Sequence, residues 1–126
     1  MKKYISLMIV LALFVSVLSA CSSGRNIDPE YRKVGEAGLG LAQAYLDGRV
    51  DLDTAKEKAE RIRADLDALP LLPEASKDFK DSEAVSLRVS SICFSLFLQR
   101  PEDSTDELVA TLSKLSESLS KILYGE

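Results

Sequence analysis

Two cysteines and many serines could act as nucleophiles, but the chain has no histidine to accept a proton from them. Histidine is the commonest general base near neutral pH and the commonest ligand of transition metals. Ser118 and Lys121 match a Ser-x-x-Lys pair in letters, yet no convincing partner motif accompanies them. Cys93 lies in a strongly apolar stretch, where a thiol usually packs as a small apolar group. These residues therefore favour a protein that is not an enzyme.

Three aspartates, Asp47, Asp51 and Asp53, surround Gly48 and invite comparison with a calcium site. In an EF-hand loop the glycine follows three alternating ligands, whereas Gly48 directly follows the first of these acids. The required loop geometry is therefore missing, and capping of a helix by Asp51 explains the cluster better. We expect neither a metal nor a cofactor.

Gly35, Gly38 and Gly40 lie within a segment that otherwise favours a helix. Each costs about 1 kcal/mol of helix stability relative to alanine, so a compensating feature is expected. The simpler explanation is a close approach to a bulky neighbouring helix through Phe94 or Phe97. The alternative is a groove beside the glycines that admits a ligand or a partner segment. That groove would be lined by Tyr31, Gly35, Gly38 and Tyr45.

The N-terminal segment carries the most specific pattern in the chain. Two lysines precede an apolar stretch, residues 4–17, and the tetrad Leu18-Ser19-Ala20-Cys21 follows. A short apolar stretch behind a positive start is typical of an export signal, since a membrane span needs about 20 apolar residues. The tetrad resembles the lipobox of bacterial lipoproteins and matches all four of its positions. This resemblance implies that residues 1–20 are removed and that Cys21 becomes the lipid-bearing first residue.

The resemblance to lipoproteins implies a location as well as a modification. Acyl chains on Cys21 would anchor the protein durably, because each buried methylene contributes about 0.8 kcal/mol. Residues 21–27 would form a flexible tether that reaches roughly 20 Å, so the domain would stay on the exported side of a cell membrane or an outer membrane. Two alternatives remain open, namely an uncleaved membrane anchor and a plain secretory signal cut near Ala20.

The charge balance argues against one class of partner. With 20 acidic and 16 basic residues the net charge is −4, and loss of Lys2 and Lys3 with the leader would make it more negative. Nucleic-acid binding depends on clustered Lys and Arg that displace counterions, and the sequence contains no such cluster. We therefore expect no nucleic acid as partner.

Because the lipid would occupy Cys21, Cys93 has no cysteine with which to form a disulfide.

The remainder, residues 28–126, has the length of one domain and a 3.6-residue apolar period throughout. Caps and breakers such as Asp28, Gly48, Asp51 and Pro70 divide it into segments. Short connections favour antiparallel neighbours, so the predicted fold is all-α, a four-helix up-down-up-down bundle. The predicted helices cover about residues 28–47, 51–69, 76–99 and 104–124.

The last two predicted helices carry further expectations. The third is the most apolar part of the mature chain and is expected to be the most enclosed. The fourth is expected to open with a capping box, in which the side chains of Ser104 and Glu107 each bind a free backbone amide. Its apolar seam would consist of Leu108, Leu112, Leu115, Leu119 and Ile122.

The predicted anchor and the missing catalytic groups favour a membrane-anchored, non-enzymatic helical module. Its partners would be the membrane, through the lipid on Cys21, and a protein or another envelope component. The alternative is a small-ligand carrier or sensor with a pocket near the glycines of the first helix. An enzyme that works through two buried carboxylates is the least favoured hypothesis.

Overall fold

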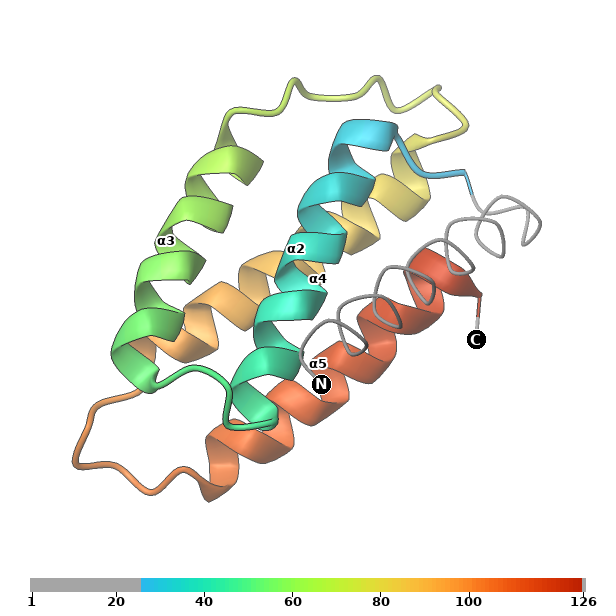
Figure 1. Cartoon of the computed structure of the whole chain (residues 1–126). Coiled ribbons are helices and arrows are strands. Elements are labelled where there is room, and N and C mark those ends of the chain that lie inside the picture. Colours follow the sequence, from blue (N-terminus) through green and yellow to red (C-terminus); the bar gives the residue numbers. More distant parts are fainter. Residues whose placement is uncertain (1–25, 126) are drawn as a thin grey trace, which may run out of the picture.

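The computed structural model describes residues 26–125 and confirms the all-α prediction (Figure 1). Successive helices alternate in direction, so the chain forms the predicted four-helix bundle, and the described residues contain no strand. The predicted lipobox, Leu18 to Cys21, lies outside the described residues, as does the tether as far as Arg25. The helices are α2 (Pro29–Leu46), α3 (Leu52–Asp67), α4 (Phe79–Leu98) and α5 (Asp106–Tyr124).

The centre of the bundle is formed by α2 and α4. Each of them contacts the other three helices, whereas α3 and α5 do not contact each other. In Figure 1, α4 lies behind α2, with α3 and α5 on either side. This arrangement flattens the bundle. The fully buried side chains where the helices meet include Val85, Val89, Ile92, Leu96, Leu112, Leu119 and Leu123.

The ends of α2 and α3 follow the predicted local chemistry. The carboxylate of Asp28 accepts a hydrogen bond of 3.0 Å from the amide of Glu30, and Pro29 occupies the first helical position. Asp51 caps α3 by accepting a 2.8 Å hydrogen bond from the amide of Thr54. Gly48 adopts a φ of 74°, a left-handed conformation that ends α2 without the strain a side chain would cause there.

Asp51 also makes the stability of the fold depend on pH. Hydrogen bonds from the backbone and then the side chain of Thr54 hold the pKa of Asp51 below its ordinary 3.8. A carboxyl whose pKa is lowered by folding stabilises the fold above its unfolded pKa, and this stabilisation is lost as the pH falls through the folded value. We therefore expect acidification to lower the unfolding free energy of the wild-type protein more than that of Asp51→Asn, which retains a capping oxygen but does not titrate.

The measurement is urea denaturation of both proteins at about pH 5 and about pH 2.5, above and below the ordinary pKa of 3.8. The difference in unfolding free energy between wild type and Asp51→Asn should move in favour of Asp51→Asn at the lower pH. The other carboxyl groups are common to both chains, so their titration cancels. A difference that stays constant across this range would contradict the assigned role of Asp51.

The predicted start of α5 is wrong. The backbone of Thr105 is already helical, with φ −84° and ψ −8°, and its side chain makes no capping hydrogen bond. Ser104 receives only a 3.4 Å hydrogen bond from the amide of Asp106, so it does not form the expected capping box with Glu107. Asp103 instead accepts a 3.2 Å hydrogen bond from the amide of Arg100 and closes the loop before α5. In the same way α4 begins at Phe79, later than predicted, because Ser76 forms a turn with Asp78.

The buried seam of α5 also differs from the strict heptad. Ser116 and Leu123 are buried, whereas Leu115 and Ile122 are only partly buried. A straight α-helix has 3.6 residues per turn, so positions repeated every seven residues drift around its surface. Leu108, Leu112 and Leu119 are buried as predicted.

The expectation that α4 is the most enclosed helix is wrong. Val85, Val89 and Ile92 on its inner face are fully buried, but Leu87 and Leu98 on its outer face are 56% and 68% exposed. The cause is the flattened packing, in which α3 and α5 flank α4 without closing over it. Within the described part of the chain, no helix has both the length and the apolarity needed to cross a membrane.

The folded domain begins one residue earlier than predicted. Ile27, expected in the tether, is only 8% exposed and belongs to the core. The amide of Asp28 donates a 2.9 Å hydrogen bond to the hydroxyl of Ser82, a fully buried residue of α4. The start of the domain is therefore fixed against the first turns of α4.

Candidate functional site

Gly35 and Gly38 allow α2 to approach its neighbours closely. A Cβ on Gly35 would lie 2.7 Å from Cγ1 of Val85 and 3.1 Å from Cδ2 of Leu123, and one on Gly38 would lie 3.1 Å from Cγ2 of Val89. The predicted close approach is thus confirmed. The side chains that fill the space are the two valines, and not Phe94 or Phe97, which are 55% and 38% exposed.

The predicted groove of Tyr31, Gly35, Gly38 and Tyr45 is not formed, since valine side chains occupy the space beside the glycines. Tyr31 is buried and donates a 2.9 Å hydrogen bond to the carbonyl of Pro70, which holds the loop between α3 and α4. Tyr45 lies near the other end of α2 and lines a separate hollow beside Asp51. The two tyrosines therefore serve different ends of the bundle.

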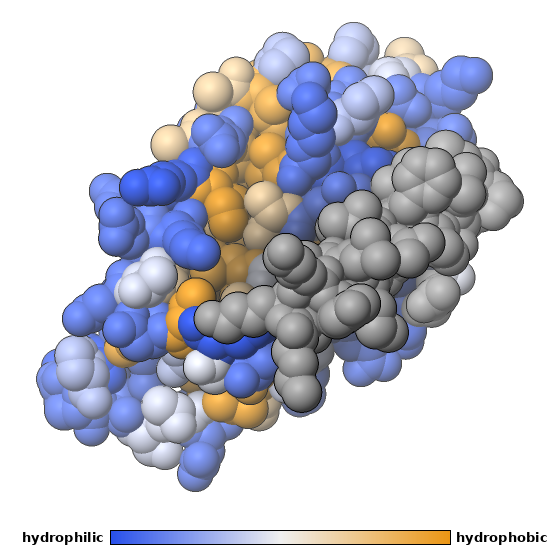
Figure 2. Space-filling view, in the orientation of Figure 1, coloured by the Kyte–Doolittle hydropathy of each residue, from blue (hydrophilic) through white to orange (hydrophobic). Residues whose placement is uncertain are grey.

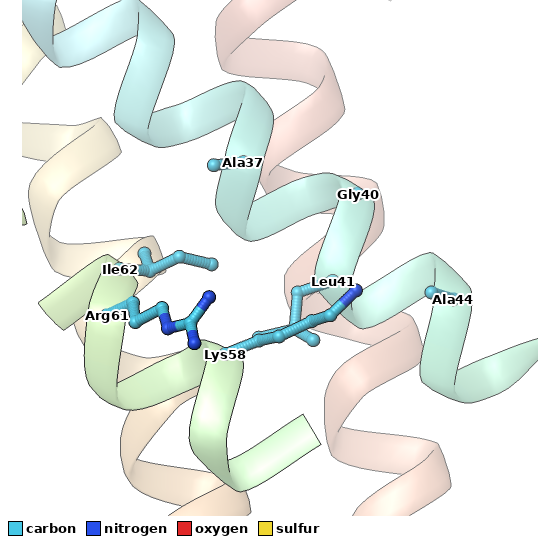
Figure 3. A pocket seen from close by; sticks show the side chains of 7 residues that line it. All are labelled: Ala37, Gly40, Leu41, Ala44, Lys58, Arg61 and Ile62. Atoms are coloured by element: carbon cyan, nitrogen blue, oxygen red, sulfur yellow. The ribbon is translucent and has the colours of Figure 1, made fainter. Parts of the chain in front are cut away.

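Gly40 faces the other way and borders an open hollow. A Cβ built on Gly40 would meet nothing within 4 Å. The hollow beside it has a volume of about 350 Å³ and lies between α2 and α3 (Figure 3). Its lining residues are Ala37, Gly40, Leu41, Ala44, Lys58, Arg61 and Ile62.

A second hollow of about 280 Å³ continues the first toward the start of α2, since both are lined by Ala37 and Ile62. We call the two hollows together the α2–α3 groove. The residues that line only the second hollow are Glu30, Lys33, Val34, Asp65, Ala68 and Leu69.

The α2–α3 groove exists because α2 presents small residues to α3. Ala37, Gly40 and Ala44 are spaced by three and four residues and therefore lie on one side of the helix. Beneath them, Leu41 and Ile62 are 5% and 9% exposed, so the floor of the groove is an outward continuation of the core. Figure 2 shows apolar atoms along the line where α2 and α3 meet.

Two cationic side chains of α3 border the groove. Lys58 and Arg61 extend from α3 toward α2 in Figure 3. The guanidinium of Arg61 lies 3.3 Å from a carboxylate oxygen of Glu57, and both side chains are largely exposed. Such surface ion pairs contribute little, so Arg61 can turn toward an incoming anionic group at small cost. The groove thus suits a binding partner with apolar side chains and acidic groups beside them.

Ser118, Lys121 and Cys93 each have a structural partner in the described part of the chain. Ser118 accepts a 2.8 Å hydrogen bond from Nε of Arg88, while Lys121 pairs with Glu117 at 3.4 Å. The buried thiol of Cys93 donates to the carbonyl of Ala59 at 3.5 Å, and burial raises its pKa to about 11. A thiol with so high a pKa carries almost no thiolate near neutral pH, and the thiolate is the reactive form.

The acidic cluster at the end of α2 also has a structural explanation. Asp51 caps α3, and Asp47 pairs with Arg49 at 3.3 Å. Among residues 26–125, no group of three or more acidic or cysteine side chains is placed to hold a metal ion.

No protein-family model, curated protein or solved structure matches this chain. Function is therefore inferred from its own residues. The α2–α3 groove was not predicted from the sequence, although the spacing of Ala37, Gly40 and Ala44 was a usable signal for it. Cys21, the predicted lipidation site, lies outside the described residues.

Proposed function

We propose that the chain is an exported lipoprotein, anchored by a lipid on Cys21, whose helical domain binds a partner and catalyses nothing. The apolar leader and the tetrad Leu18-Ser19-Ala20-Cys21 support the anchor. The buried position of Ile27 leaves only residues 22–26 between the lipid and the folded domain. A tether of this length reaches about 20 Å, so the domain works at the membrane surface.

We further propose that the partner is a segment of another envelope protein that lies in the α2–α3 groove. The observation that carries this proposal is the pair of adjacent hollows between α2 and α3, whose floor of Leu41 and Ile62 belongs to the buried core. Two hollows in a row suit an elongated segment, because sites for small molecules usually enclose most of the ligand surface. Lys58 and Arg61 on the rim favour a segment that carries acidic side chains.

The test is to block the α2–α3 groove with a larger side chain at a position that lines it. Ala37 lines both hollows, so Ala37→Leu should place apolar bulk in the groove without entering the core. A photo-crosslinking residue at Lys33, which lines the second hollow, is expected to give one discrete adduct in membranes of the producing cells. Ala37→Leu should lower the yield of that adduct about tenfold, the effect of losing one well-packed contact.

Ala110→Leu is the matched control, because Ala110 is exposed on α5, away from the groove. It should leave the adduct unchanged. An adduct that persists in Ala37→Leu, or that never forms from Lys33, would contradict binding in the α2–α3 groove.

A second candidate is a small-ligand carrier. The volume of about 350 Å³ beside Gly40 favours it, since it falls at the lower end of the range of ligand sites. Native mass spectrometry of the purified protein would then show a bound small molecule that Ala37→Leu displaces, and no adduct from Lys33.

A further inference from the structure

The outer face of α4 carries an apolar ridge on which no other helix of residues 26–125 packs. Leu87, Phe94 and Leu98 are spaced by seven and four residues, which places them in one line along the helix. They are 56%, 55% and 68% exposed, and Phe97 beside them is 38% exposed. The fully buried residues of α4, such as Val89, lie on the opposite side. We call these four exposed side chains the outer ridge of α4.

The charges around the outer ridge differ from those of the rest of the chain. Between Glu83 and Glu102 there is no acidic residue, although the chain holds 20 of them. Arg88 and Arg100 are the charged residues of this stretch, and Nε of Arg88 donates to Ser118 on α5. Glu83 lies one turn before Leu87, and two basic and two acidic residues of α3 border the hollow beside Phe97. An apolar helix face whose own residues from 84 to 101 include no acid suits the boundary between lipid headgroups and acyl chains, where phosphates accept hydrogen bonds from a residue such as Arg100.

The described part of the chain begins at Asn26, and its first residues lie beside the start of α4. The hydrogen bond from the amide of Asp28 to the hydroxyl of Ser82 fixes the exit of the tether at the first turns of α4. Leu87 lies about 7.5 Å further along the helix axis, and Leu98 about 24 Å. A lipid on Cys21 would therefore hold the start of α4 within about 20 Å of the bilayer, close enough for the ridge to reach it.

We propose that the outer ridge of α4 lies on the bilayer in which the lipid of Cys21 is anchored. The proposal rests on the lipid anchor of the proposed function. Tethering raises the effective concentration of the ridge at the bilayer to the millimolar range, so a weak contact is enough to populate this orientation. Because α2 lies on the other side of α4, the α2–α3 groove then faces away from the membrane, toward a partner.

A second copy of the chain fits the outer ridge less well. A fully exposed Phe or Leu offers at most about 200 Å², and the four ridge side chains are only partly exposed. Together they supply roughly half of the ~800 Å² that each partner contributes to a stable dimer. A bilayer needs no such complementary surface.

The experiment uses the absence of tryptophan from the chain. Phe94→Trp places the sole tryptophan on the outer ridge, where it can be excited apart from the tyrosines, and Gln43→Trp places it at an exposed site of α2. Both lipidated proteins, purified from membranes, are reconstituted into vesicles of phosphatidylcholine and phosphatidylglycerol with brominated acyl chains, which quench nearby tryptophan. The Phe94→Trp reporter should be quenched at least about threefold more strongly than the Gln43→Trp reporter.

Leu87→Gln with Leu98→Gln in the Phe94→Trp chain should lower the quenching to the level of Gln43→Trp. Both positions are exposed, so the fold should persist, and circular dichroism checks this. Equal quenching of the two reporters would overturn the proposal. So would an emission of the Phe94→Trp reporter that shifts with protein concentration and ignores the bromine, because that result indicates a dimer.

The mass of the same preparations separates this proposal from the lipid anchor. An unmodified Cys21 would overturn the anchor alone. The chain is then attached to the vesicles through a maleimide lipid on Cys21, and the ridge is judged by the same quenching ratio. The buried thiol of Cys93, with its raised pKa of about 11, does not compete for the maleimide.

Discussion

Cys21→Ala is expected to reduce incorporation of labelled fatty acid to background and to leave the product longer by the 20 residues of the leader. The thiol of Cys21 is the atom that would carry the lipid, and the resemblance to lipoproteins implies that leader cleavage follows lipidation. The variant should remain with the membrane through its apolar leader, so sedimentation alone does not distinguish it from wild type. Labelling and electrophoretic size are the informative measurements.

Cys93→Ala provides a control that the chain itself offers. Cys93 is the other cysteine of the sequence, and it is fully buried against the carbonyl of Ala59. Its replacement should leave both the label and the leader cleavage at the wild-type level. Label that survives Cys21→Ala, or disappears in Cys93→Ala, would contradict the assignment of Cys21 as the lipid-bearing residue.

Gly35→Ala and Gly40→Ala are expected to change stability in opposite directions although they lie five residues apart on α2. A Cβ on Gly35 would stand 2.7 Å from Cγ1 of Val85, a stiff and fully buried side chain. Such overpacking costs about 1–3 kcal/mol, and the second close contact, 3.1 Å to Cδ2 of Leu123, favours the upper part of this range, above the gain of about 1 kcal/mol in helix propensity. Gly40→Ala meets no atom of residues 26–125 within 4 Å and should keep the whole gain.

The two variants should therefore differ in unfolding free energy by about 1–3 kcal/mol, the overpacking cost that Gly35→Ala alone bears. Thermal denaturation measures this, since about 1 kcal/mol moves the midpoint by roughly 4–8 °C in a domain of this size. Adding Val85→Ala should remove the penalty of Gly35→Ala, because the clashing methyl group is gone. Equal effects at the two glycines would mean that α2 does not approach α4 as closely as described.

The helices could be predicted because their ends are determined locally. The residue types alone indicate where α2 begins, where it ends and where α3 begins. The residues responsible are Asp28, Gly48 and Asp51, which act on amides or carbonyls within a few residues. The prediction of where α5 begins was wrong because Asp103 and Arg100 close the loop before the helix. Ser104 then lies one residue before Thr105, which occupies the N-cap position. The residue types at positions 104 and 107, Ser and Glu, are the same for this arrangement as for a capping box.

The enclosure of α4 and the filling of the space beside each glycine of α2 could not be predicted, because both depend on how the helices pack. The apolar period predicts a helix that carries Leu87 and Phe94, but it does not show whether another helix covers their side chains. The three glycines of α2 indicate a close approach, but only the placement of Val85 and Val89 shows that Gly35 and Gly38 are filled while Gly40 stays open. Local pattern thus determines the elements, and their mutual packing determines where a partner can bind.

The rim of the α2–α3 groove shows the same limit. In the sequence, Lys58 and Arg61 belong to a run of mixed charges that is most simply a solvated, ion-paired face, and Arg61 does pair with Glu57. Their position beside Leu41 and Ile62 becomes visible only once α2 lies against α3. A surface charge thereby becomes part of a candidate binding site.

The mass of the protein isolated from its natural membranes tests the central proposal most directly. We predict a mature chain that begins at residue 21 and whose first residue is heavier by a diacylglyceryl group on sulfur. An intact chain from Met1 with a free thiol at that position would contradict it.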